Sequence, residues 1–203
     1  MFKGHPKGLI VAFFANMGER FGFYTMMAIL VLFLQAKFGL RENEAGWIYG
    51  AFYFLIYALA LGGGLIADRT RKYKGVIQIG LIVMFLGYVL LAIPGMGLPM
   101  AIIGLFTIAF GNGLFKGNLQ ALVGQMYDDP RYSKLRDSAF SLFYMGINIG
   151  AVFAPNAARA IRTWYLGTHG LAYDSSLPSL CHQYLTGDTQ NAALLQELAN
   201  KVS

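Results

Sequence analysis

Charged residues are scarce in this 203-residue sequence. Asp, Glu, Lys and Arg together account for 13% of the chain, whereas a soluble domain carries about 25%. Hydrophobic residues account for 56%, so the chain has too few polar side chains to cover an ordinary soluble surface. This imbalance indicates a membrane protein.

Cysteine is also nearly absent, because Cys181 is the only one. An internal disulfide is therefore excluded within this sequence. His169 and His182 lie in the same carboxyl-terminal segment, but their spacing from Cys181 matches no metal-ligand pattern. The apolar segments carry no pair of nucleophile and base either. The sequence thus predicts no metal site, no cofactor and no enzyme.

The hydrophobic residues are grouped into runs long enough to cross a bilayer, which takes about 20 residues. The first run is too long for the apolar part of a signal peptide and lacks a small-residue cleavage site, so we expect a retained helix. The sequence predicts an all-α membrane protein whose five transmembrane helices lie near Leu9–Phe33, Gly46–Ala67, Val76–Ile93, Pro99–Val123 and Ser138–Ala157.

The basic residues lie mainly in short segments between these runs. The formal charge is +6, but this layout sets the orientation of a membrane protein and does not form a stripe for nucleic acid. The amino terminus, the second connection and the fourth connection are basic, so we expect them on the cytoplasmic side. The carboxyl-terminal segment then lies outside.

The composition changes after Arg162. Residues 163–203 are richer in Thr, Ser, Gln, Asn and Asp, and only Asn191–Val202 has the apolar pattern of a short amphipathic helix. We expect residues 1–162 to form the transmembrane bundle and residues 163–203 to form an extracytoplasmic loop or small cap.

Three charges interrupt the apolar runs: Glu19, Arg20 and Lys116. A charge at the centre of a spanning helix costs roughly 2.5–3.5 kcal/mol on insertion scales, so it usually faces a protein interior or a water-filled path. Asn16, Arg20 and Tyr24 share one helix face. Glu19 and Arg20 are neighbours that do not face each other, so we expect each to need a partner on another helix or a ligand. Lys116 is the candidate partner for Glu19.

Four segments resemble the proton-coupled oligopeptide transporters, a branch of the major facilitator superfamily. Glu19–Tyr24 looks like the end of their first-helix pattern, Glu-x-x-Glu-Arg-Phe-x-Tyr-Tyr, and Gly62–Arg69 resembles the superfamily's cytoplasmic loop motif. Gly111–Asn118 and Phe140–Ala151 resemble the family's fourth and fifth helices. The resemblance implies an amino-terminal bundle of inverted three-helix repeats that ends before its sixth helix, with the carboxyl-terminal half required for transport missing.

The resemblance also implies roles for single residues. Arg20 and Lys116 would bind the carboxylate of a di- or tripeptide, and Glu19 would take part in proton coupling, with the proton gradient as energy source. In the family the peptide is faced by residues at the positions of Tyr24, Tyr57 and Asn148, and the cytoplasmic gating motif falls on Asp68 and Arg69. The partners would be peptides and the lipid bilayer of the inner cell membrane.

Two departures from the family pattern stand out. Asn16 takes the place of the first glutamate, and Met27 takes the place of an arginine two turns beyond Arg20. One acid and one base are lost together, so the predicted site keeps a charge of +1, which an anionic substrate end would neutralise. Two alternatives remain: a facilitator-type carrier of another organic anion, and a non-transporting membrane fragment.

Overall fold

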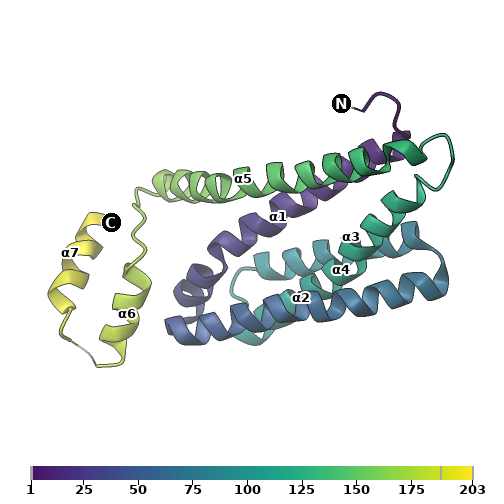
Figure 1. Ribbon diagram of the computed structural model, residues 1–203. Coiled ribbons are helices and arrows are strands. Elements are labelled where there is room, and N and C mark those ends of the chain that lie inside the picture. The colour runs from purple at the N-terminus through teal and green to yellow at the C-terminus, as the bar shows by residue number, and fades with distance from the viewer. Residues whose placement is uncertain (1, 188, 203) are drawn as a thin grey trace. The chain divides into compact units, whose positions relative to one another are not determined.

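The structure is a computed structural model that describes residues 2–187 and 189–202, and these residues form helices and no strand (Figure 1). Five helices are long and apolar enough to cross a membrane, which confirms the predicted fold class. The helices are α1 Lys7–Phe38, α2 Glu42–Thr70, α3 Tyr73–Ala92, α4 Leu98–Gln125, α5 Arg136–Thr168, α6 Leu177–Leu185 and α7 Ala192–Val202.

The long helices follow from their apolar sequence, because a spanning segment in lipid must satisfy its own backbone hydrogen bonds. Proline has no backbone N–H, and Pro99 lies in the first turn of α4, where no N–H donor is needed within the helix. Pro155 is an exception, since it lies inside α5. Gly39 ends α1 with a φ of +65°, and its N–H donates to the Gln35 carbonyl at 2.9 Å.

The carboxyl-terminal segment contains more helix than the sequence analysis predicted. Helix α5 continues to Thr168, so the expected division at residue 162 falls inside a helix. Helix α7 matches the predicted amphipathic stretch, although the side chain of Val202 lies outside the described part. Helix α6 was not predicted, yet Pro178 in its first turn was a usable start signal.

The described residues form two compact units. One contains the chain up to Gly18 together with Gly50–Asn148, and the other contains Glu19–Tyr49 together with the chain from Ile149 onward. Helices α1, α2 and α5 are therefore shared between the two units.

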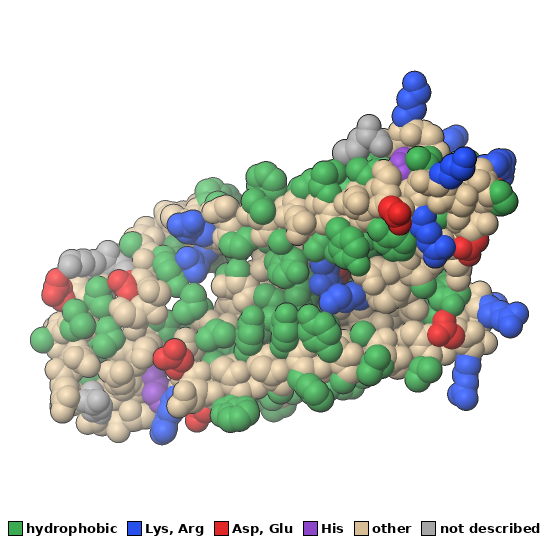
Figure 2. Space-filling model, viewed as in Figure 1, with side chains coloured by type: hydrophobic (Ala, Val, Ile, Leu, Met, Phe, Trp, Pro, Cys, Tyr) green, Lys and Arg blue, Asp and Glu red, His purple; other side chains and the backbone are tan. Residues whose placement is uncertain are grey.

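In the first unit α3 packs closely against α4 through glycine. A Cβ on Gly80 would lie 2.8 Å from the carbonyl oxygen of Gly111, and a Cβ on Gly87 would lie 2.9 Å from that of Gly104. Helix α4 is well enclosed, with 56% of its most hydrophobic stretch buried, against at most 28% in the other four long helices. Many hydrophobic side chains point outward instead, along the flanks of the long helices (Figure 2), as expected for a surface in contact with lipid.

The three basic segments of the first unit lie at the same end of it (Figure 1). The ring of His5, in the amino-terminal segment, hydrogen-bonds the Tyr127 hydroxyl after α4 at 2.7 Å. The connection between α2 and α3, which holds another of these segments, lies at this end as well (Figure 1). The segments thus share one end, which the prediction of a common membrane side requires.

Candidate functional site

Glu19 and Arg20 form a buried ion pair. The guanidinium Nε and Nη2 of Arg20 donate to the two carboxylate oxygens of Glu19, the second bond measuring 2.6 Å. Arg20 is only 4% exposed. The expectation that these neighbours do not face each other was wrong, because both side chains are long enough to fold back along the helix and meet in a bidentate fork.

Aromatic rings line the Arg20 guanidinium in the same unit. Its central carbon lies 4.8 Å from the ring centre of Phe23 and 5.8 Å from that of Tyr24. Tyr24 therefore shares a site with Arg20, as the helix periodicity predicted. Phe23 was noted in the sequence only as a departure from the family's tyrosine, but its ring offers the cation a π face.

Asn16 makes a contact between helices. It is 5% exposed, and its Nδ2 donates to the backbone carbonyl of Phe143 in α5 at 3.4 Å. The amide at this position therefore has a structural partner inside the first unit.

Lys116 and Tyr57 also lie together within the first unit. The Lys116 Nζ is 4.6 Å from the centre of the Tyr57 ring, which is half exposed. Among the described residues of this unit, Lys116 forms no ion pair with a carboxylate. Glu19 belongs to the other unit, so its pairing with Lys116 stays a prediction.

The remaining predicted residues lie on helix surfaces. Asp68, near the end of α2, accepts a hydrogen bond from the Tyr73 hydroxyl at 2.6 Å. Arg69 and Asn148 are exposed. The gating role of Asp68 and Arg69 and the peptide contact of Asn148 stay predictions.

Asn118 is a buried residue to which the sequence analysis gave no role. Its Nδ2 donates to the carbonyl of Gly63 in α2 at 3.0 Å and to that of Leu114 at 2.8 Å. It thereby ties α4 to α2 two residues away from Lys116. The signal was a polar residue in an apolar run, which in a membrane helix often bonds another helix.

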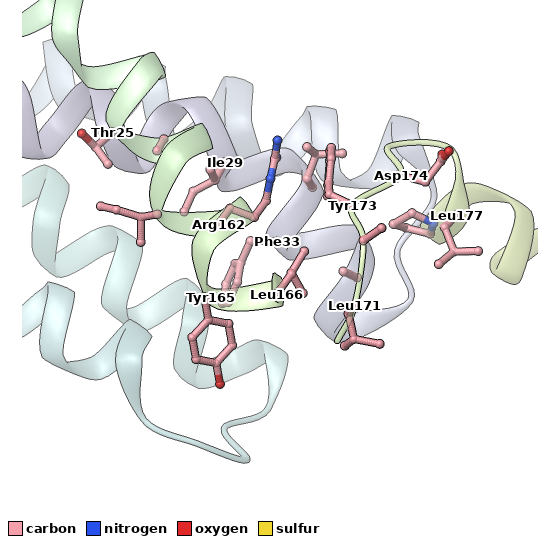
Figure 3. A pocket seen from close by; sticks show the side chains of 16 residues that line it. Thr25, Ile29, Phe33, Arg162, Tyr165, Leu166, Leu171, Tyr173, Asp174 and Leu177 are labelled. Atoms are coloured by element: carbon pink, nitrogen blue, oxygen red, sulfur yellow. The ribbon is translucent and has the colours of Figure 1, made fainter. Parts of the chain in front are cut away.

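A largely apolar cavity of about 620 Å³ lies within the second unit. Figure 3 shows Ile29 and Phe33 from α1 and Leu166 from α5 among the side chains that line it. The Arg162 guanidinium lies 3.3 Å from the centre of the Tyr173 ring. None of the predicted site residues is among the described residues that line this cavity.

Comparison with known proteins identifies the family. The model of the POT family matches residues 74–178, which is more than half of the chain. The chain belongs to the POT family. This membership, with the five spanning helices, makes it part of a multi-pass membrane protein and agrees with the resemblance found in the sequence.

Curated relatives of the chain are named as dipeptide and tripeptide permeases. The chain is 38% identical over 151 residues to dipeptide and tripeptide permease A of Cronobacter turicensis, which covers 73% of this chain and 30% of the permease. It is 38% identical over 162 residues to dipeptide and tripeptide permease B of Xenorhabdus bovienii, covering 79% and 32%. The chain thus spans about a third of the length of these relatives.

Solved POT structures share the fold. A peptide transporter in complex with sulfate superposes with a TM-score of 0.69 at 34% identity, covering 94% of this chain and 39% of that one. A POT transporter in complex with a thioalcohol-conjugated peptide superposes with a TM-score of 0.70 at 33% identity, covering 77% and 32%.

Proposed function

We propose that this chain is the amino-terminal part of a proton-driven importer of di- and tripeptides that binds the peptide carboxylate in a central cavity. The observation that carries the proposal is the environment of the Lys116 side chain. Lys116 is a half-buried residue in an apolar helix; its ammonium lies over an aromatic ring and, among the described residues of its own unit, forms no ion pair with a carboxylate. A cation in this setting favours an anionic ligand. The permease names of the relatives support a peptide as that ligand.

The pair of Glu19 and Arg20 supplies a route for coupling to protons. While Glu19 is ionised, its carboxylate occupies the guanidinium of Arg20 in a bidentate fork. A proton on Glu19 removes that negative charge and leaves Arg20 in need of another anion. The peptide carboxylate would then replace the Glu19 carboxylate, so that one proton and one peptide enter together. Tyr24, next to Arg20, and Tyr57, next to Lys116, would each face the peptide.

The remaining parts of the proposal concern the whole carrier. Its amino terminus would lie in the cytoplasm, residues 163–203 would lie outside the inner membrane, and Asp68 and Arg69 would act in cytoplasmic gating. Alternating access needs two bundles around one site. Residues 1–203 alone should therefore insert into a membrane without transporting peptide. Uptake of a dipeptide by vesicles containing only these residues, above that of empty vesicles, would contradict this.

Uptake by the complete carrier in proteoliposomes tests the function. An inward proton gradient should drive accumulation of a labelled dipeptide, and a dipeptide amidated at its carboxyl terminus should compete poorly. Lys116→Ala and Arg20→Ala should each nearly abolish uptake, whereas Lys134→Ala, in the exposed fourth connection, should leave it unchanged. Normal uptake by both site variants would show that the two charges are only structural.

A carrier of another organic anion is the second candidate. It is favoured by Asn16, which places a hydrogen-bonded amide where the family pattern has an acid. The same proteoliposomes distinguish the two, because organic acids without a peptide bond would then compete with the labelled substrate better than dipeptides do.

A further inference from the structure

Tyr53 lies one helical turn before Tyr57 on α2. The two hydroxyl oxygens are 3.3 Å apart, within hydrogen-bond distance, and either can be the donor. The ring centres are 5.3 Å apart at an interplanar angle of 59°. Tyr53 therefore holds Tyr57 at two points, through the hydroxyl and through the ring.

Tyr57 in turn contacts Lys116. The ammonium lies over the face of the Tyr57 ring, where attraction depends on the cation staying over the ring centre. A half-exposed tyrosine on a helix surface is free to change rotamer unless a neighbour restrains it. A rotation of the Tyr57 ring would move the surface on which the ammonium rests. All three residues belong to the first unit.

We propose that Tyr53 is a positioning residue of the substrate site: it fixes the Tyr57 ring and, through that ring, the Lys116 ammonium that meets the peptide carboxylate. The inference rests on the proposed function. Tyr53 fixes the position of the Lys116 ammonium, so its effect should be confined to substrates that carry a free carboxylate.

The test uses Tyr53→Phe in the complete carrier, because this change removes the hydroxyl and keeps the ring. Losing one hydrogen bond should raise the KM for a free dipeptide about 3- to 10-fold. We expect kcat to stay close to normal, and the KM for the amidated dipeptide to stay unchanged. Tyr53→Leu also removes the ring contact and should raise the KM for the free dipeptide further. Tyr184→Phe removes an exposed tyrosine hydroxyl in α6 and is the matched control.

A double-mutant cycle checks the route through Tyr57. In a Tyr57→Phe background, Tyr53→Phe should raise KM clearly less than it does alone, because its bond to the Tyr57 hydroxyl is already gone. Additive effects of the two changes would overturn the inference. An equal rise in KM for the free and amidated dipeptides would overturn it too, since Tyr53 would then shape the cavity or touch another part of the peptide.

Wild-type kinetics separate a failure of this inference from a failure of the proposed function. If the wild-type carrier transports free and amidated dipeptides with the same KM, the carboxylate role of Lys116 fails, and the inference fails with it. If the wild type distinguishes them and Lys116→Ala removes the distinction, but Tyr53→Phe leaves every KM unchanged, the inference alone is wrong.

Discussion

Gly63 of α2 and Gly113 of α4 bring the backbones of their two helices into direct contact. A Cβ added to Gly63 would overlap the carbonyl group of Gly113, and one added to Gly113 would lie 2.7 Å from the carbonyl carbon of Leu59. The Asn118 amide bonds the carbonyl of Gly63 beside this contact. The crossing of α2 and α4 therefore fixes the separation of the helices that carry Tyr57 and Lys116.

Gly63→Ala should lower the free energy of unfolding by about 1–3 kcal/mol, because the obstructing atoms are backbone and cannot move aside by changing rotamer. Unfolding of the purified protein in detergent measures this. The matched control is Gly64→Ala, since a Cβ there would meet nothing within 4 Å. Equal stability of the two variants would contradict the close crossing.

Breaking the buried pair of Glu19 and Arg20 should cost more than removing it. Arg20→Ala should destabilise the protein by about 3–5 kcal/mol, because it leaves a buried carboxylate without its cation. Adding Glu19→Gln to Arg20→Ala should restore part of this loss. The same unfolding assay gives the result, and a double variant less stable than Arg20→Ala would show that the two side chains do not depend on each other.

Asn16 and Met27 allow a test of charge balance in the complete carrier. Asn16→Glu alone should reduce uptake by cancelling the positive charge of the site, and Met27→Arg alone should reduce it by adding a cation at a cost of about 2.5–3.5 kcal/mol. Both together should recover activity, with a favourable coupling of at least ~1 kcal/mol in a double-mutant cycle of initial uptake rates.

The hydrogen bond from Asn16 to the Phe143 carbonyl requires a control for this cycle. A carboxylate at position 16 loses the donor as well as changing the charge. Asn16→Leu removes the amide donor without adding a charge, which should cost about 1 kcal/mol. Strictly additive losses in the cycle, beyond the loss seen in Asn16→Leu, would mean that the two departures from the family pattern are unrelated.

Asp129 should titrate at unusually low pH. Hydrogen bonds from the Arg131 side chain, followed by one from its backbone N–H, lower the pKa of this exposed carboxyl from 3.8 to about 2. The ion pair is therefore complete above the ordinary pKa of 3.8 and is lost as the pH falls toward 2. Arg131→Ala should raise the pKa of Asp129 only part of the way, because the backbone donor remains. Carboxyl ¹³C NMR titration measures it, with Lys134→Ala as the unchanged control.

Most of the fold could be predicted from the sequence because hydrophobic length is a strong signal in a membrane protein. The five long helices were predicted from the length of their hydrophobic runs. Helix ends were less certain: α5 runs through Arg159 and Arg162 to Thr168, since polar residues can continue a helix after the apolar run has ended. Short α6 has too few residues for periodicity to identify it.

The site could be predicted in part. Periodicity correctly predicted that Tyr24 lies beside Arg20, and the apolar setting marked Glu19, Arg20 and Lys116 as candidate site residues, a role that stays a prediction. The direct pair of Glu19 and Arg20 was missed because the Cα–Cβ bonds of adjacent helix residues point in different directions. The two side chains are long enough for their charged ends to meet all the same. Tyr53 was missed although its spacing of four residues from Tyr57 places both on one face.

The division of the chain into two units has a mechanical consequence. The boundary crosses α1 between Gly18 and Glu19, α2 between Tyr49 and Gly50, and α5 between Asn148 and Ile149. Any movement of one unit against the other must therefore be absorbed by bending or torsion in these three continuous helices. The first crossing lies at the peptide bond next to the ion pair, so a twist there would change how the Arg20 side chain reaches Glu19. A proton that loosens this pair and a twist that strains it would then act on the same few atoms.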